Sequence, residues 1–154
     1  MLNIELLEKS IPVAPIKILA LEGCKDLAQA VDSHLVKFRK ELSEHNKSGL
    51  NPQGYSEESF IVECECPRFG TGEGKGYIRE SVRGCDIFIM VDITNYSGTY
   101  TVRGHENHMS PDNHYQDLKR IISAATGKAH RINVIMPFLY EGRQHRRTSR
   151  ESLD

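Results

Sequence analysis

The segment 85–92 constrains the fold more than any other stretch of this chain, because it is a nearly continuous run of Ile, Phe, Met and Val. Such a strand is buried on both faces, which is typical of a parallel sheet covered by helices. Aliphatic runs at 16–21 and 131–136 predict two further strands. Segments 60–66 and 76–80 predict two more.

Two amphipathic helices separate the predicted strands. Apolar residues recur every three or four positions over 27–42 and again over 115–125. Ser110, with a proline beside it, begins the second helix as a capping residue. Segments 44–59 and 95–109 have no period and are expected to be surface loops. Strands that alternate with helices predict an α/β domain with a mainly parallel central sheet flanked by helices.

Composition and charge narrow the class of protein. The 154 residues suffice for one domain, and 20 Lys and Arg nearly balance 21 Asp and Glu, for a formal charge of −1. The longest mostly apolar stretch, 132–140, falls short of the roughly 20 residues that span a bilayer. No signal peptide pattern begins the chain, so we expect a cytoplasmic protein with no membrane partner. The 4 cysteines are expected to be reduced thiols.

A glycine cluster, RFGTGEGKG, lies between two predicted strands. Its glycines, Gly70, Gly72, Gly74 and Gly76, would let backbone N–H groups approach an anion, so a phosphate cradle is one interpretation. The cluster is not a Walker A loop, because Phe69 stands where the first glycine belongs and Gly76 where Ser or Thr would hold magnesium. A hairpin loop is the preferred interpretation from residue chemistry alone.

Two neighbouring cysteines could be ligands of a metal site. Cys64 and Cys66 lie two residues apart on a predicted strand and therefore face the same side. A zinc site would need partners such as His105, His108 or His114. No second tight ligand pair is present, so two core thiols are the preferred interpretation, and the three histidines are expected to be solvated.

The end of the chain is rich in arginine. Arg143, Arg146, Arg147 and Arg150 follow the last predicted strand, and ligands of parallel sheets collect at the carboxyl ends of strands. The guanidinium of Arg143 suits a phosphate or a purine ring, and Gln144 can donate and accept in the plane of a base. Nucleic-acid binding is an alternative, but the overall charge and the lack of interleaved aromatic residues argue against it.

Several motifs in fixed order resemble one family. They are RFGTGE at 68–73, IRESVRG at 78–84 with the strand 85–91, DN at 112–113, RINVIMP at 131–137, YEGRQ at 140–144 and RRTSRE at 146–151. Together they resemble the N-terminal half of ribose-phosphate pyrophosphokinase, also called phosphoribosyl pyrophosphate synthase. The resemblance runs from about Ile16 to the last residue, with segments 44–59 and 95–109 as insertions.

The resemblance implies a fold and an activity. It implies that residues 1–154 form a phosphoribosyltransferase-like domain with a small β-hairpin flap, the N-terminal domain of a two-domain synthase whose C-terminal domain is absent from this chain. With ATP and Mg²⁺, such an enzyme transfers diphosphate to ribose 5-phosphate and gives phosphoribosyl pyrophosphate and AMP for nucleotide biosynthesis. The complete protein is expected to be a homo-oligomer with no nucleic-acid partner.

The resemblance also implies a nucleotide site shared between subunits. The adenine of ATP is held by an arginine and a glutamine from one subunit, which correspond to Arg143 and Gln144. The neighbouring subunit supplies a phenylalanine and a glutamate, which correspond to Phe69 and Glu73. An aromatic ring can stack on a purine, and a carboxylate can accept from an exocyclic amine or a ribose hydroxyl.

Four residues further along correspond to phosphate sites of the family. Arg146 and Arg147 are expected near the phosphates of ATP, and Ser149 and Arg150 near a regulatory phosphate. The catalytic and magnesium-binding loops of the family lie beyond residue 154, so no metal ligand is assigned in this chain. We expect the chain alone to be inactive.

Two positions depart from the family pattern. Thr71 replaces an acidic residue in the loop, and His145 replaces the acidic residue that follows the arginine and glutamine pair. These departures and the two insertions favour an alternative hypothesis, a non-catalytic homologue that assembles with, or regulates, a true synthase.

Overall fold

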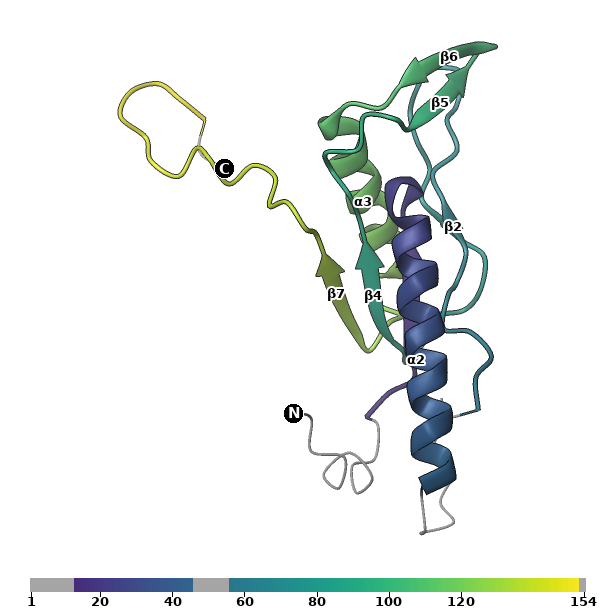
Figure 1. Cartoon of the computed structure of the whole chain (residues 1–154). Helices are drawn as coiled ribbons and strands as arrows, with labels where there is room; N and C mark the ends of the chain where they lie inside the picture. The colour runs from purple at the N-terminus through teal and green to yellow at the C-terminus, as the bar shows by residue number, and fades with distance from the viewer. Residues whose placement is uncertain (1–12, 46–55, 153–154) are drawn as a thin grey trace.

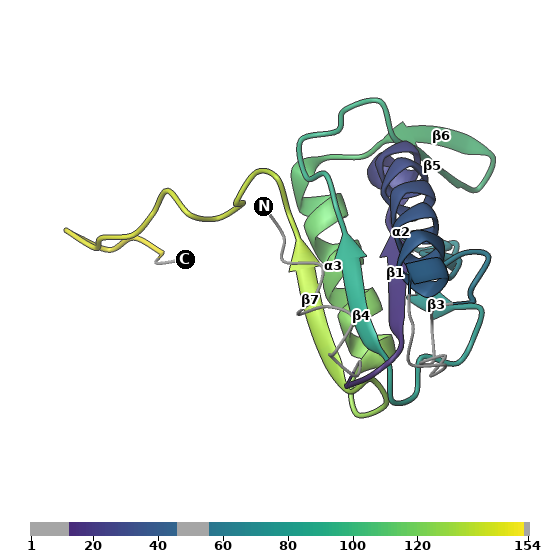
Figure 2. The same cartoon turned by 60° about the horizontal axis from the view of Figure 1, so that its bottom comes forward.

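A three-stranded parallel sheet forms the centre of the protein. The computed structural model describes residues 13–45 and 56–152. The strands β1 (Ile16–Ala20), β4 (Asp86–Met90) and β7 (Arg131–Ile135) lie in the order β1-β4-β7. Helix α2 (Lys25–His45), which follows the short 3₁₀ helix η1 (Glu22–Cys24), covers one face, and α3 (Pro111–Ala125) covers the other (Figures 1 and 2). The predicted α/β class is confirmed.

The strands divide their side chains between two cores. On β1, Ile18 packs in the α2 core and Leu19 in the α3 core. On β4, Met90 packs in the α2 core and Ile89 in the α3 core. Because successive side chains of a strand point to opposite faces, a strand covered on both sides must be apolar at nearly every position. This requirement explains the continuous aliphatic run of β4.

Two small antiparallel hairpins accompany the sheet. Strand β2 (Cys64–Glu65) pairs with β3 (Tyr77–Ile78), and β5 (Thr99–Val102) pairs with β6 (His105–His108). The second hairpin corrects the expectation of an irregular loop at 95–109. Most of its side chains are exposed or half-buried, so its sequence lacks the apolar alternation that reveals a strand.

The segment 60–66 is less regular than predicted. Ile61 forms an isolated parallel bridge with Ile18, and only β2 belongs to a ladder. A buried carboxylate helps to hold the start of this segment, since Asp32 of α2 accepts hydrogen bonds from the Phe60 N–H at 2.6 Å and the Ser59 hydroxyl at 2.9 Å.

Both helices form where the sequence predicts them, but the buried face of α2 differs slightly from the prediction. Leu27 is 48% exposed, whereas Ala28, Asp32 and Leu42 are buried, so the apolar stripe of α2 begins one residue later than expected. Ser110 caps α3 as predicted, and its hydroxyl accepts from the Asn113 N–H at 3.2 Å. Neither helix, over the residues that can be described, has the length and apolar character needed to cross a membrane.

Candidate functional site

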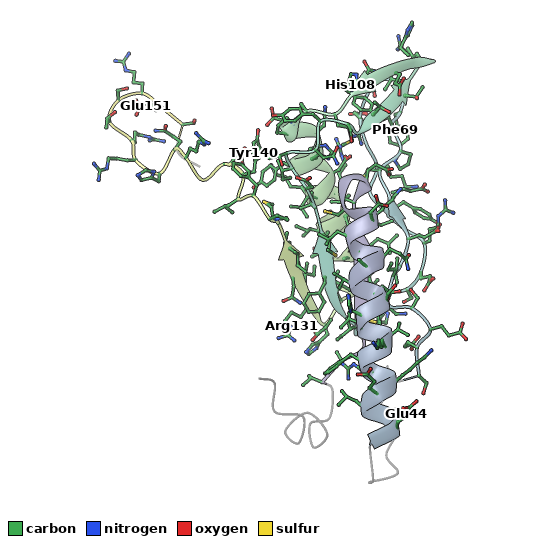
Figure 3. All side chains as sticks on the ribbon, in the orientation of Figure 1. Glu44, Phe69, His108, Arg131, Tyr140 and Glu151 are labelled. Atoms are coloured by element: carbon green, nitrogen blue, oxygen red, sulfur yellow. The ribbon has the colours of Figure 1, made fainter. Side chains whose placement is uncertain are left out.

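The features with unusual chemistry gather at the carboxyl end of the sheet. The β5–β6 hairpin lies there. The C-terminal tail, residues 136–152, leaves β7 at the same end (Figure 1). Phe69 of the glycine cluster lies beside this hairpin, near His108 (Figure 3). In open α/β sheets, ligands bind at this edge, because the loops that follow parallel strands converge there.

The glycine cluster is the loop of the β2–β3 hairpin, and we call residues 68–76 the glycine loop. The Phe69 N–H donates to the Glu73 carbonyl at 2.8 Å, the Gly72 N–H to the Phe69 carbonyl at 2.9 Å, and the Lys75 N–H to the Pro67 carbonyl at 3.0 Å. Gly72 has a φ of +93°, a conformation that favours glycine. These three N–H groups are used within the hairpin, which favours the hairpin interpretation over a phosphate cradle.

The loop presents two of the predicted site residues to solvent. The Phe69 side chain is 55% exposed, and the exposed Glu73 carboxylate accepts from the Thr71 hydroxyl at 3.2 Å. An exposed aromatic ring can stack on the flat face of a base. Phe69 is therefore available for stacking, with a carboxylate four residues away.

A buried ion pair fixes the base of this loop. The guanidinium of Arg68 donates to both oxygens of Asp117 on α3, at 2.8 Å each. The sequence motifs assign Arg68 no role and do not single out Asp117. The sequence nevertheless contained a signal for this ion pair. Asp117 lies on the same face of α3 as His114 and Ile121, and a carboxylate buried on that face needs a cation.

Tyr140, near the start of the tail, anchors it to helix α3. Tyr140 donates to the Asp112 carboxylate at 2.5 Å, and its ring meets Tyr115 edge-on at 5.5 Å between ring centroids. The hydrogen bond to Asp112 raises the pKa of Tyr140 to about 12. Beyond this anchor the chain extends away from the body of the protein, as both cartoon views show (Figures 1 and 2).

The predicted tail residues make local contacts. The Gln144 amide donates to the Arg146 carbonyl at 2.7 Å, and the His145 ring contacts the Arg143 carbonyl at 3.0 Å. The arginines Arg143, Arg146, Arg147 and Arg150 are exposed, and in the part of the chain that the structure describes none of them forms an ion pair. Their positive charge is thus free to meet an anion.

Ser149 lies in a small turn held by a carboxylate. Glu151 accepts from the Thr148 N–H at 2.9 Å and the Ser149 N–H at 3.3 Å. The hydrogen bond from the Thr148 N–H lowers the pKa of Glu151. A phosphate bound at Ser149 would compete with this carboxylate for the same backbone donors.

The two halves of the predicted adenine site do not meet within one chain. Phe69 lies on the side of the β5–β6 hairpin, whereas the tail that carries Glu151 extends from the opposite side of the molecule (Figure 3). The anchor residue Tyr140 lies between them. Arg143 and Gln144, which follow this anchor, therefore belong to a different surface from Phe69.

Cys64 and Cys66 are free thiols that pack against the core. In residues 13–45 and 56–152, no group of three or more His, Cys, Asp or Glu side chains is arranged to hold a metal ion. The packing of the two thiols against the α3 core is in line with the preferred interpretation. Burial raises the pKa of Cys64 to about 11 and that of Cys66 to about 12, so both are protonated at neutral pH.

One histidine corrects the expectation of solvated side chains. His105 and His108 lie exposed on the β6 strand as expected. His114 is only 2% exposed, and its Nε2 lies 2.7 Å from the Asn95 carbonyl oxygen. Its spacing from Leu118 and Ile121 places it on the buried face of α3.

Comparison with known proteins points to one family. The family described as the N-terminal domain of ribose phosphate pyrophosphokinase matches residues 16–154. A ribose-phosphate pyrophosphokinase of Staphylococcus saprophyticus is 29% identical over 141 residues, which cover 90% of this chain and 32% of that protein. Its counterpart from Staphylococcus epidermidis is 31% identical over 140 residues, with 89% and 32% covered.

A solved structure is similar as well. The crystal structure of phosphoribosylpyrophosphate synthetase from Mycobacterium smegmatis superposes with a TM-score of 0.49 at 20% identity, covering 90% of this chain and 35% of that one. The chain spans about a third of the length of the curated relatives it matches.

Proposed function

Because this chain belongs to the family of N-terminal domains of ribose-phosphate pyrophosphokinase, we propose that it is the ATP-contributing domain of such an enzyme. The complete cytoplasmic enzyme would transfer diphosphate from ATP to the anomeric hydroxyl of ribose 5-phosphate and release AMP. Phosphoryl-type transfer depends on positioning and on neutralising charge, and this domain would supply the positioning of the nucleotide base.

The proposed adenine site lies between two subunits of a homo-oligomer. Arg143 and Gln144 of one subunit would contact the base, and Phe69 and Glu73 of the next would complete the site. The observation that supports this arrangement is the separation of the exposed Phe69 from the exposed arginines of the tail (Figure 3). Phe69 and Arg143 are both exposed, and in this structure Phe69 and the tail that carries Arg143 lie on different sides of the molecule.

Phosphate contacts would follow along the same tail. We propose that Arg146 and Arg147 meet the phosphates of ATP, for which the guanidinium fork is well suited. Ser149 and Arg150 would take part in a regulatory phosphate site. We assign the magnesium ion of the reaction to no residue of this chain.

Nucleotide binding tests the proposed site. Stacking on an aromatic ring contributes about 1–3 kcal/mol per base, so Phe69→Ala should weaken ATP binding by about 5- to 150-fold. Arg143→Ala should also weaken ATP binding. Isothermal titration calorimetry measures both affinities, with Tyr77→Ala and Arg83→Ala as matched substitutions outside the proposed site.

Mixing the two variants tests the shared site directly. When Phe69→Ala and Arg143→Ala subunits assemble together, some sites regain both intact halves, so a fraction of tight ATP binding should return. If neither variant alone loses tight binding, the assignment is wrong. Loss of binding without recovery on mixing would show that both halves act within one subunit.

The alternative is a non-catalytic homologue that regulates a synthase. Thr71 and His145 favour it, because both replace an acidic residue expected at the nucleotide. In the structure Thr71 instead donates to Glu73, one of the proposed adenine contacts. The two functions differ in one assay: the chain, with any sequence encoded after Asp154, either forms AMP and phosphoribosyl pyrophosphate with Mg²⁺, or binds a synthase without turnover.

A further inference from the structure

The glycine loop is tied to two other elements by side chains that the proposed adenine site does not use. The first tie joins the loop to α3 through Arg68 and Asp117. Their side chains are only 3% and 7% exposed, and Arg68 also donates to the Cys66 carbonyl at 3.0 Å. A bidentate ion pair between a planar guanidinium and a carboxylate fixes the relative orientation of the two groups as well as their distance.

The second tie is the close packing of the loop against Arg120, one turn further along α3. Arg120 is held within the helix, since it donates to the same Asp117 oxygen at 2.6 Å. A Cβ on Gly74 would lie 2.3 Å from an Arg68 nitrogen and 2.6 Å from an Arg120 nitrogen, and one on Gly76 would lie 2.5 Å from the Arg120 carbonyl oxygen. These two glycines therefore allow the loop backbone to rest directly on the helix.

The third tie comes from the β5–β6 hairpin. Its two turn residues, Arg103 and Gly104, have φ values of +50° and +79°. Asn, Asp or Gly is the usual first residue of a two-residue turn with this geometry, and an arginine there is strained. The strained residue is the one that reaches the glycine loop, since the Arg103 Nε donates to the Gly70 carbonyl at 2.9 Å.

The three ties act on both neighbours of one residue. Arg68, which precedes Phe69, is held by α3, and Gly70, which follows it, is held by the hairpin. The Arg68 guanidinium also lies over the Tyr100 ring of β5, at 4.9 Å from the ring centroid, so the first tie also contacts the hairpin. The Phe69 side chain is exposed between them.

We infer that Asp117, Arg120 and Arg103 are positioning residues for Phe69. They hold the glycine loop against α3 and the hairpin, so that the aromatic ring is presented in one orientation before a nucleotide arrives. Preorganisation of this kind raises affinity because less freedom is lost on binding. The effect on ATP rests on the proposed function, whereas the restraint on Phe69 does not.

A tryptophan introduced at the tip of the loop can report the restraint directly. The chain contains no tryptophan, so Phe69→Trp creates a single selective fluorophore at the position in question. In this background, Arg103→Asn removes the donor to Gly70, and asparagine tolerates the positive φ of the turn. We expect lower fluorescence anisotropy of the introduced indole and faster acrylamide quenching, with an unchanged thermal unfolding midpoint.

The matched control, in the same Phe69→Trp background, is Arg83→Asn. It removes the same charge near the N-terminal end of β4, where the Arg83 side chain is exposed and forms no hydrogen bond or ion pair within residues 13–45 and 56–152. The anisotropy of the indole should not change in this control. If Arg103→Asn leaves the indole as restrained as the control does, the inference is wrong.

ATP affinity separates this inference from the proposed function. With Phe69 in place, Arg103→Asn should weaken ATP binding by about 2- to 10-fold, the effect of one hydrogen bond. If Phe69→Ala leaves ATP affinity intact while Arg103→Asn loosens the indole, the adenine site fails and the positioning role stands. If Phe69→Ala weakens binding but Arg103→Asn changes neither readout, the positioning role fails and the adenine site stands.

Discussion

At the scale of single residues, buried carboxylates connect parts of the chain that lie far apart in sequence. Asp117 binds Arg68, Asp86 binds Arg131, and Asp32 accepts from the Phe60 N–H. Each of these aspartates is less than 9% exposed. A buried carboxylate is strongly unfavourable unless it is paired or hydrogen-bonded, so the two ion pairs and the hydrogen bond of Asp32 each form only when the correct segments come together. The pairs therefore add specificity to the two apolar cores.

Removing the charge of Asp117 should destabilise the protein. Asp117→Asn leaves two guanidinium groups, of which that of Arg68 is almost fully buried, without their counter-charge. Breaking such a pair lowers the free energy of unfolding by about 3–5 kcal/mol. Urea unfolding monitored by circular dichroism measures the change.

Glu65→Gln provides the comparison, because Glu65 pairs with Arg79 in an ion pair that is about half exposed. Exposed pairs contribute at most about 1 kcal/mol. Equal losses in the two variants would show that the Arg68 and Asp117 pair contributes no more than a surface contact.

At the scale of elements, the glycine loop depends on close contact with α3. Its glycines differ in what surrounds them. A Cβ at Gly76 would meet the backbone of Arg120 at 2.5 Å, whereas one at Gly70 would have its nearest neighbour at 3.9 Å. The cluster is thus explained at one end by backbone approach to a helix and at Gly72 by a positive φ of +93°.

Alanine substitutions should separate these roles. Gly76→Ala forces the loop away from a backbone oxygen that cannot move aside, so we expect the free energy of unfolding to fall by about 1–3 kcal/mol. Gly70→Ala brings its methyl group only into ordinary van der Waals contact, with the Arg103 Nε at 3.9 Å, and should change stability by less than about 0.5 kcal/mol. Thermal unfolding of both variants measures the difference, and similar midpoints would contradict the close packing on α3.

At the scale of the whole molecule, a packed body carries an extended tail. The sheet and its two helices form the body (Figure 2), and Tyr140 joins the start of the tail to it through Asp112 and Tyr115. Val134 and Ile135 of the edge strand β7 are each 41% exposed, so the body is incompletely covered on the side where the tail leaves.

Limited proteolysis should reveal this division. Trypsin cleaves after lysine and arginine. Within residues 13–45 and 56–152 the exposed arginines of the tail have only local contacts, so cleavage at Arg143 and the arginines that follow should precede cleavage within the sheet and its helices. The body should survive as a fragment with an unchanged unfolding midpoint. Mass spectrometry identifies the cuts, and Arg143→Gln should move the first one to Arg146. Early cleavage inside β4 or α3 would contradict the division.

The sequence by itself determined the elements and the family. Apolar patterns placed the three core strands and both helices. A strand covered on both faces must be apolar at nearly every position, and a helix that buries one face repeats apolar residues every three or four positions. Ser110 revealed a helix start for an equally local reason, since its hydroxyl bonds an N–H three residues away. The ordered motifs pointed to the family that the comparison over 16–154 shows.

Only the tertiary structure decided which of these local features meet. The β5–β6 hairpin and the contact of Arg103 with the glycine loop carry no periodic signal, and Arg103 and Gly70 lie 33 positions apart. The spacing along α3 places His114 on the buried face of the helix, but its partner, the Asn95 carbonyl 19 positions away, comes from the tertiary structure. The pair of Arg68 and Asp117 spans 49 positions. Contacts of this length depend on how elements pack, whereas a sequence pattern reports only which face of each element is apolar. For the same reason, only the fold separates Phe69 from the arginine tail.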